Sequence, residues 1–237
     1  MSGINNDLWL FDYNQGAAYE AFSQCQDTFG AIERHLQDNF DFREKIILEI
    51  GSGSGKFTPF LAKSCSKLYA VERSASLMQI NRDKNFDAVS TEFILSDVKD
   101  LTMEPDSIDV IFAGWSLTSM REYFGVIFES FRKFLRKDGI ILLVENAGND
   151  EFCKIMNLEK FTSIMKNTYV DMGFIQRKVV GTTIKLPCKN VFYDAFPNKK
   201  EVRLSSLEIL HKVLILEMQS SVLFSKNMCR YKGGRGK

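Results

Sequence analysis

Residues 46–56 of this 237-residue chain read IILEIGSGSGK, and this stretch decides the fold. An apolar, β-branched run ends in a turn with glycine at positions 51, 53 and 55. Glycine permits positive φ and places no Cβ in the path of a ligand. A helix that starts after such a turn points unpaired N–H groups at whatever lies above it. The stretch therefore predicts a buried strand that leads through a ligand-binding turn into a helix.

Four more short runs rich in apolar and β-branched residues follow, and amphipathic stretches separate them. With the first run at 45–50, these strand-sized segments lie at 67–72, 91–96, 108–113 and 139–145. The alternation predicts an α/β fold with a doubly wound, mostly parallel sheet that helices cover on both faces.

The flanking segments predict further elements. In chain order, we expect one or two helices within 7–40, a helix at 121–137 that Gly139 ends, a helix near 158–172, a strand at 174–186, a helix at 202–217 and a short strand at 220–225. The first of these segments is dense in aromatic residues, which we expect to pack as an outer layer of the core or to form a lid: Trp9, Phe11, Tyr13, Tyr19 and Phe22.

The composition excludes several classes of protein. The 31 Lys and Arg against 30 Asp and Glu leave a formal charge of +1, so no overall field draws the chain to nucleic acid or to an anionic membrane. No window suits a membrane-spanning helix, and residues 1–6 are too polar to begin a secretory signal, so we expect a cytoplasmic protein. The five cysteines form no C-x-x-C pair and predict reduced thiols, without a metal site.

Spacing separates the ligands that the glycine turn could hold. A phosphate-binding P-loop is excluded, because three residues rather than four lie between Gly51 and Gly55, and Phe57 follows Lys56. A dinucleotide fingerprint is weakened, since the long side chain of Lys56 stands where glycine or alanine is needed, but it stays open. The third pattern, an acidic residue followed by G-x-G-x-G, is present from Glu49 to Gly55.

From here the chain resembles a known family. The blocks ILEIGSGSGKFTPFLA, YAVERSASLM, ILSDVKDL, SIDVIFAGWSLTSM and FLRKDGIILLVEN are similar, in this order, to class I S-adenosylmethionine-dependent methyltransferases. The resemblance spans about residues 45–146 and is greatest to the branch of quinone-biosynthesis and small-molecule methyltransferases. It implies one Rossmann-like domain with a seven-stranded sheet and a C-terminal antiparallel strand. Within 1–237 we expect an N-terminal helical cover at 1–44, a cofactor-binding core at 45–146, an acceptor-side and sheet-completing segment at 147–226, and a flexible basic tail at 227–237.

The resemblance also implies which residues bind S-adenosylmethionine. A carboxylate that ends the second strand would accept both ribose hydroxyls, and one after the third strand would accept the adenine amino group. The acid before the turn would orient the methionine end. The implied cofactor-binding residues are Glu49, Gly51, Ser52, Gly53, Glu72, Arg73, Met78, Asp97, Val98, Gly114 and Trp115.

Catalysis is expected to rest mainly on positioning. Many relatives carry a histidine shortly after the fourth strand, but this chain has LTSM at 117–120, and its two histidines, His35 and His211, are expected to be packing or surface residues. Holding the acceptor atom, the methyl carbon and the sulfur in line supplies much of the rate. If a base acts, Glu145 is the best-placed carboxylate, with Tyr13 or Tyr19 as further candidates.

We expect the acceptor pocket between the N-terminal aromatic residues, 115–120, 145–146 and 183–196. The expected function is methyl transfer to a small-molecule metabolite or natural product. Nucleic acid is an unlikely partner on charge, and the oligomeric state is left open. Two alternatives are a methyltransferase that acts on protein or RNA, and a partner subunit that binds the cofactor without catalysis.

Overall fold

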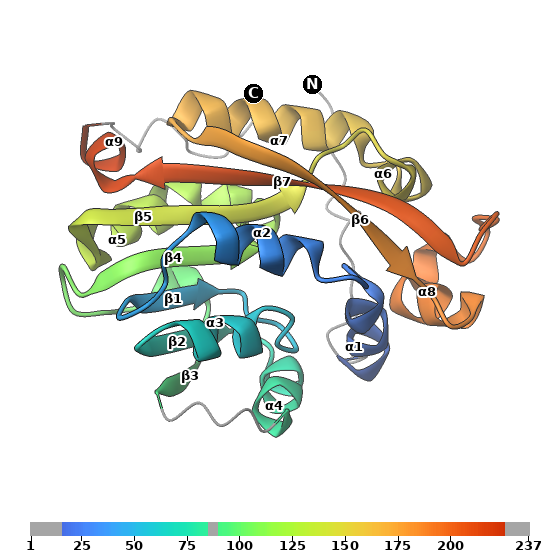
Figure 1. Cartoon of the computed structure of the whole chain (residues 1–237), viewed down its shortest axis with the longest axis horizontal. Helices are drawn as coiled ribbons and strands as arrows, with labels where there is room; N and C mark the ends of the chain where they lie inside the picture. Colours follow the sequence, from blue (N-terminus) through green and yellow to red (C-terminus); the bar gives the residue numbers. More distant parts are fainter. Residues whose placement is uncertain (1–15, 85–89, 226–237) are drawn as a thin grey trace.

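A computed structural model of the chain describes residues 16–84 and 90–225. Its centre is a seven-stranded sheet with the strand order β3-β2-β1-β4-β5-β7-β6 (Figure 1). The strands are β1 (Ile46–Ile50), β2 (Lys67–Glu72), β3 (Thr91–Leu95), β4 (Ile108–Gly114), β5 (Leu135–Asn146), β6 (Ile175–Lys185) and β7 (Glu208–Gln219). Neighbouring strands are parallel except for β7, which runs antiparallel to both β5 and β6. The predicted α/β sheet and its C-terminal antiparallel strand are confirmed.

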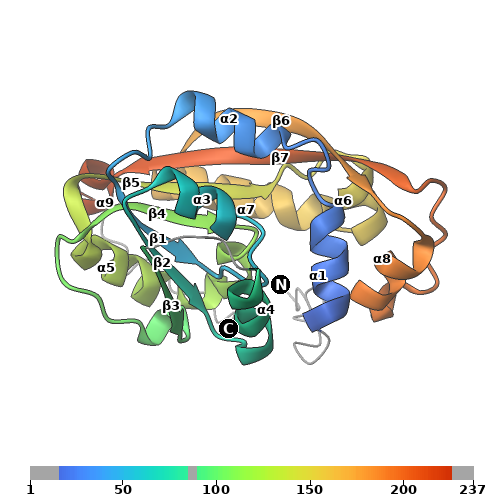
Figure 2. The ribbon, with the colours of Figure 1, turned by 60° about the horizontal axis from the view of Figure 1, so that its bottom comes forward.

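Helices cover both faces of the sheet. They are α1 (Gly16–Cys25), α2 (Ala31–Asn39), α3 (Thr58–Ser64), α4 (Ala75–Asp83), α5 (Phe124–Phe134), α6 (Glu151–Met156), α7 (Glu159–Met172), α8 (Lys189–Ala195) and α9 (Ser220–Ser225), with short 3₁₀ turns η3 (Val98–Asp100), η4 (Leu117–Tyr123) and η5 (Pro197–Lys199). Helices α2 and α3 lie on one face, while α5, α7 and α9 lie on the other (Figure 2). At one end of the sheet, α1 packs against α4 and α8.

The two faces have separate apolar cores because side chains alternate along each strand. In β1, Ile47 packs into the core beneath α2 and α3, whereas Leu48 packs into the core on the side of α5 and α7. Both are fully buried. A parallel strand covered on both faces therefore reads as the continuous apolar run from which it was predicted.

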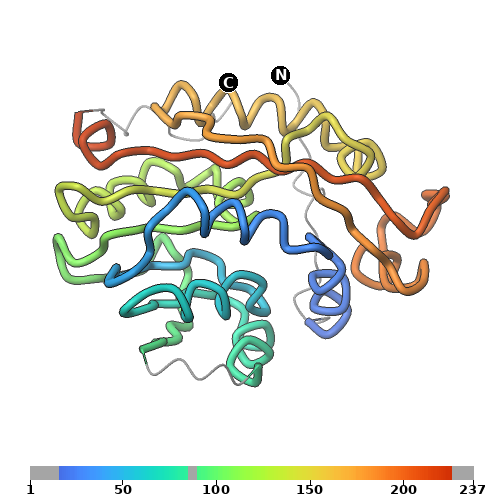
Figure 3. The backbone as a smooth tube through the Cα atoms, in the orientation of Figure 1, coloured from blue at the N-terminus to red at the C-terminus, as the bar shows by residue number. Residues whose placement is uncertain are grey.

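The last two predicted elements are wrong. The segment expected as a helix at 202–217 contains most of β7, and the segment expected as a strand at 220–225 is α9. Strand β7 lies between β5 and β6 (Figure 3), where both of its faces are buried from Val213 to Met218. A short apolar run buried on both sides has no period of two, so its apolar spacing also suits a helix.

A second correction concerns the boundary between α5 and β5. The predicted helix at 121–137 is present as α5, with Phe124, Ile127, Phe128 and Phe131 buried along one side. However, the helix ends at Phe134, and Leu135 already pairs with Ile108 of β4. Arg136 bonds to Asp109 at 2.8 Å from within β5, whereas Arg132 and Lys133 lie in the last turn of α5.

Among residues 16–84 and 90–225, no helix is long and apolar enough to cross a membrane. No cluster of three or more His, Cys, Asp or Glu side chains in those ranges could hold a metal ion. The cysteines at 25, 65, 153 and 188 are free thiols, two of them buried, and Cys229 lies outside the described residues.

Candidate functional site

A cavity of about 170 Å³ lies at the carboxyl ends of five neighbouring strands. It is lined by residues at or just after these ends: Gly51 and Gly53 after β1, Glu72 and Arg73 at β2, Ser96, Asp97 and Val98 after β3, Gly114, Trp115 and Ser116 at β4, and Asn146 at β5. Open α/β sheets bind their ligands at this edge. The cavity therefore lies where the order of the strands places a ligand.

The glycine turn forms part of the cavity wall and has left-handed backbone geometry. Gly51, Gly53 and Gly55 have φ values of +65°, +56° and +86°. A Cβ on Gly51 would lie 2.5 Å from Ser116 Cβ, and one on Gly55 would lie 2.2 Å from Asn81 Oδ1. A Cβ on Gly53 would meet no atom closer than Tyr19 Cε1, at 3.8 Å. Hence Gly51 and Gly55 are required for packing, whereas Gly53 leaves bare main chain facing the cavity.

Glu72 lies at the end of β2 and is held firmly by main-chain donors. Its Oε2 accepts a hydrogen bond from Gly53 N at 3.0 Å, and its Oε1 accepts one from Ser74 N at 2.8 Å. Each carboxylate oxygen has a second acceptor site, so both can also accept a hydroxyl from a bound ligand. The side chain thus links the glycine turn of β1 to the start of α4.

Asp97, which begins η3, forms the neighbouring part of the wall with Val98. Its Oδ1 accepts the N–H of Lys99 at 3.2 Å, and its Oδ2 lies 3.4 Å from Lys99 Nζ. Leu77, one turn into α4, also lines the cavity beside Arg73. This side of the cavity therefore combines carboxylates with an apolar surface.

Three predicted cofactor-binding residues lie behind the cavity wall. Glu49 is buried below the turn, where its Oε2 accepts a hydrogen bond from Thr58 Oγ1 at 2.7 Å. Burial raises the pKa of Glu49 to about 8, although the hydrogen bond from Thr58 lowers it. The protonated form of this carboxyl is therefore favoured at neutral pH. Ser52 and Met78 are buried as well and do not line the cavity. Contact of these three side chains with a cofactor stays a prediction.

Glu145, the predicted base, is absent from the lining of the main cavity. It lies in a second pocket of about 10 Å³ under α7, where its Oε1 accepts hydrogen bonds from Thr118 N at 3.3 Å and from Tyr169 Oη at 3.2 Å. Burial raises the pKa of Glu145 to about 7 and that of Tyr169 well above its usual value. In this arrangement Glu145 anchors η4, whose residues Ser119, Met120 and Tyr123 line the cavity.

Trp115 occupies a strained position at the end of β4. Its φ is +50°, its N–H donates to Val144 O at 2.8 Å, and its ring packs against Phe57 with the ring centres 5.4 Å apart. A Cβ on the preceding Gly114 would approach the same Phe57 ring to 2.4 Å. The chain turns sharply here, and Trp115 forms part of the cavity wall.

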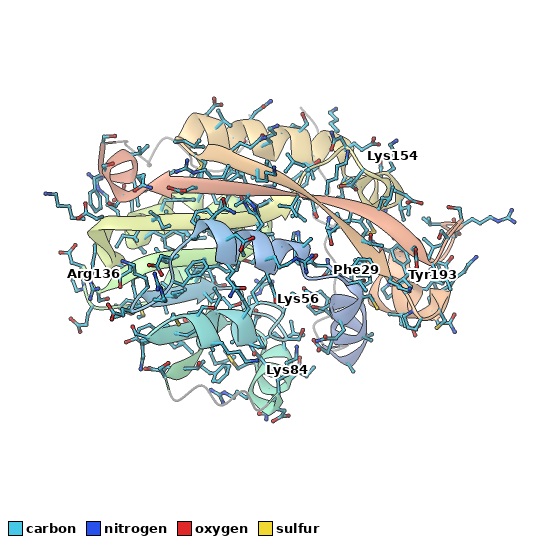
Figure 4. All side chains as sticks on the ribbon, viewed as in Figure 1. Phe29, Lys56, Lys84, Arg136, Lys154 and Tyr193 are labelled. Carbon is cyan, nitrogen blue, oxygen red and sulfur yellow. The ribbon has the colours of Figure 1, made fainter. Side chains whose placement is uncertain are left out.

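Helix α1 covers the cavity from the N-terminal side. Tyr19 and Phe22 line the cavity, and Phe22 is also buried in the core, whereas a role of these residues as a lid stays a prediction. Lys84 bonds to Glu20 of α1 at 2.9 Å, and Lys56 donates to the carbonyl of Gln26 (Figure 4 labels both lysines). Trp9, Phe11 and Tyr13 lie outside the described residues.

The predicted acceptor segments contribute Ser116, Ser119, Met120, Asn146 and Phe196 to the cavity. The sequence interpretation missed the contribution of α6, which adds Phe152 and Met156, and of Leu158, two residues beyond its end. A signal was present, because Asp150 is an N-cap residue and two large apolar side chains follow four residues apart. Asp150 Oδ1 does accept the N–H of Cys153 at 2.8 Å.

The residues present fit S-adenosylmethionine. A nucleoside needs acceptors for its hydroxyls and amino group, bare main chain for close approach and an apolar surface for its base. Glu72 and Asp97 supply the acceptors, Gly53 the bare main chain, and Leu77 an apolar side chain. Aromatic rings such as those of Tyr19 and Trp115 are also suited to a cationic centre like a sulfonium.

Comparison with known proteins agrees with this chemistry. Residues 48–143 match a family model described as a methyltransferase domain. Phosphoethanolamine N-methyltransferase 1 of Zea mays is 35% identical over 109 residues, which are 45% of this chain and 22% of that protein. Ribosomal RNA small subunit methyltransferase A of Mesomycoplasma hyopneumoniae is 27% identical over 123 residues, 50% of this chain and 44% of that protein. These matches span less than half of each curated relative.

Among solved structures, the chain is similar to Haemonchus contortus phosphoethanolamine N-methyltransferase 1 in complex with phosphoethanolamine and S-adenosylhomocysteine. The TM-score is 0.53 at 14% identity, over 98% of this chain and 54% of that one. At this identity the likeness supports the fold alone.

Proposed function

Residues 48–143 form a class I S-adenosylmethionine-dependent methyltransferase domain, and from this premise we propose that the chain methylates a small-molecule amine. The observation that carries the proposal is the cavity itself. Carboxylates and bare glycine main chain lie on the side of β1, β2 and β3, while aromatic and aliphatic side chains enclose the side of β5 and α6. A donor and a small acceptor can therefore meet at Trp115, between the two.

In the proposed complex Gly51, Gly53, Glu72 and Asp97 hold the cofactor. When bound, S-adenosylmethionine supplies an electrophilic methyl group, and its transfer leaves S-adenosylhomocysteine. Glu72 holds the glycine turn and α4 in fixed relation through its two main-chain hydrogen bonds. Tyr19 and Phe22 exclude water from above, and the anchored η4 fixes the wall opposite the turn. Positioning of this kind supplies about 7 to 11 kcal/mol of a barrier.

An amine suits this site better than an acceptor that must first lose a proton. A neutral amine already carries the lone pair that forms the new bond. The carboxylates that line the described part of the cavity, Glu72 and Asp97, lie at β2 and β3, and Glu145 is bonded to Thr118 and Tyr169 behind the wall. The proposal therefore needs no base beyond solvent, which takes the proton that the methylated ammonium releases.

Calorimetry of the full chain with S-adenosylmethionine and S-adenosylhomocysteine, with NADH as control, tests the cofactor. Incubation with methyl-labelled S-adenosylmethionine and a metabolite extract, in parallel with ribosomal RNA, tests the acceptor. We expect both sulfur ligands to bind and label to enter a small basic product. Binding of NADH alone, or label in RNA only, would refute the proposal.

A further inference from the structure

The half of the cavity opposite the carboxylates has its own chemistry. In the sheet, β1, β4 and β5 lie between β2 and β7. The half of the cavity away from β2 and β3 is lined by Asn146 at the end of β5, by residues of later segments and by Phe22 of α1. Most of them are apolar: Phe152, Met156, Leu158 and Phe196, with Phe22 from α1 packed against Phe196 at 4.8 Å between ring centres. We call this half, together with Asn146, the acceptor chamber.

Asn146 is the polar residue of the acceptor chamber, and a buried histidine fixes its amide. His211 of β7 places Nε2 2.9 Å from Asn146 Oδ1, and both residues are buried. An amide oxygen only accepts, so Nε2 carries the hydrogen and donates it. The amide nitrogen of Asn146 is then left with two hydrogens to donate, and within the described residues the side chain has no other hydrogen bond.

The His211 ring is held in place from two sides. The Trp115 ring stacks on it with centres 5.9 Å apart, and the Phe152 ring lies 4.8 Å away on centres. Burial lowers the pKa of His211 to about 4, so the ring is neutral at physiological pH. Both flanking rings line the cavity, whereas His211 does not. His211 is therefore a positioning residue that orients Asn146 from behind the wall.

Among residues 16–84 and 90–225, no cationic side chain lines the acceptor chamber. Within the described part of the chain, Glu72, Arg73 and Asp97 are the charged residues that line the cavity, and all three lie at β2 and β3. A phosphate dianion placed among Phe152, Met156 and Phe196 would lose its hydration and gain in return, from the described residues that line this half, the neutral amide of Asn146 and no cation.

We infer that the acceptor chamber selects an amine with an apolar body and a hydrogen-bond-accepting group for Asn146, and rejects a phosphorylated amine. This inference rests on the proposed function. It sets the substrate class apart from the phosphoethanolamine that the name of the Zea mays relative specifies.

The test compares tyramine with O-phosphotyramine, which differ only in phosphate, and adds phosphoethanolamine as a third probe. The full chain is saturated with S-adenosylhomocysteine, which first shows whether the cofactor binds, and is then titrated with tyramine, O-phosphotyramine and phosphoethanolamine. We expect tyramine to bind at least about tenfold more tightly than either phosphate ester. Tighter binding of a phosphate ester, or no binding of tyramine at millimolar concentration, would overturn the inference. Failure of S-adenosylhomocysteine to bind would instead overturn the proposed function.

Two variants test the roles of Asn146 and His211. Asn146→Ala should weaken tyramine binding about tenfold and leave S-adenosylhomocysteine binding unchanged, the loss expected for one hydrogen bond in a buried site. His211→Phe keeps the stacking but loses the donor, so it should weaken tyramine binding by a similar factor. Asn39→Ala is the matched control, because Asn39 bonds to His35 on exposed α2. Unchanged tyramine binding in the folded Asn146→Ala variant would remove Asn146 from the acceptor chamber.

Discussion

Replacing Gly53 and Gly55 separately by alanine distinguishes a ligand-binding position from a packing position within one turn. Both glycines have positive φ, so both substitutions carry the same kind of backbone cost, about 1 to 2 kcal/mol. They differ in what the new methyl group meets. At Gly53 the nearest atom is Tyr19 Cε1 at 3.8 Å, which is ordinary contact, whereas at Gly55 it is Asn81 Oδ1 at 2.2 Å.

The expected magnitudes follow from these distances. Gly53→Ala should lower the free energy of unfolding by the backbone cost alone, or roughly 2 to 4 °C in melting temperature for each kcal/mol in a chain of this size. Gly55→Ala must also displace the fully buried Asn81, which donates to Thr58 Oγ1 at 3.0 Å. Overpacking of about 1 to 3 kcal/mol and a lost hydrogen bond of about 1 kcal/mol bring its total to about 3 to 6 kcal/mol.

For binding of S-adenosylhomocysteine, unlike stability, we expect Gly53→Ala to be the more damaging of the two substitutions. A methyl group on Gly53 enters the space where we place the cofactor, and a clash of about 1 to 3 kcal/mol weakens binding about 5- to 150-fold. Thermal unfolding and calorimetric titration with S-adenosylhomocysteine measure the two quantities on the same preparations. If the folded Gly53→Ala variant binds S-adenosylhomocysteine as the wild type does, the glycine turn is not the cofactor cradle. If Gly55→Ala proves as stable as Gly53→Ala, the packing argument is wrong.

Glu72→Gln should weaken binding of S-adenosylhomocysteine about 10- to 100-fold, because hydrogen bonds to a charged acceptor are worth about 1.5 to 3 kcal/mol. Glu92→Gln, at an exposed position on β3, is the control and should not weaken binding. Equal affinities of the two variants, measured by calorimetry, would contradict this prediction. Glu145→Gln should flatten the pH dependence of stability between pH 5 and 7. The raised pKa of Glu145, about 7, means that the folded state holds a proton that the unfolded state loses near pH 4.5, so wild-type stability falls as pH rises through this window, by at most about 3 kcal/mol. Urea unfolding at pH 5 and 7 measures the difference, and parallel pH profiles would refute it. Asp150→Ala should lower the free energy of unfolding, measured in urea, by about 2 to 3 kcal/mol, because Asp150 caps α6 and accepts a hydrogen bond from Lys212 N at 2.8 Å. Asp150→Asn should lower the free energy of unfolding by less. Equal losses in the two variants would assign the effect to the charge of Asp150 instead.

The cofactor side of the cavity could be predicted because its signals are local in the sequence. Gly53 and Glu72 each stand at the end of an apolar run, and the ends of parallel strands meet at one edge of the sheet. Asp97 follows the same logic after β3. The prediction therefore required the order of strands and their lengths, and no knowledge of distant contacts.

Which of two adjacent residues faces the cavity could not be predicted in the same way. Glu145 and Asn146 are neighbours at the end of β5, so their side chains point to opposite faces of the sheet. A shift of one residue in register exchanges their positions. The structure places Glu145 beside Tyr169 under α7 and brings Asn146 to the main cavity. The sequence pattern alone favoured the carboxylate, because acid–base chemistry was expected there.

The Asn146–His211 pair depends on the element that was predicted wrongly. The two residues are 65 positions apart, and they meet because β7 pairs antiparallel with β5, with Asn146 opposite Val213. A helix at 202–217 offers no such pairing, so His211 had no partner in the sequence interpretation. The misread strand thus concealed the positioning residue.

The extent of the family match explains why relatives of this chain can differ in acceptor. The match ends at residue 143, three residues before Asn146, and the acceptor chamber is built almost wholly from residues after that point. The matched segment contains Gly53, Glu72 and Asp97, which we assign to the cofactor, so similarity over this segment reports on the donor. The names of the Zea mays and Mesomycoplasma hyopneumoniae relatives specify phosphoethanolamine and ribosomal RNA, two unlike acceptors. Evidence about the acceptor of this chain must therefore come from β5, α6 and β7, where the described residues that line the cavity form an apolar wall with one oriented amide and no cation.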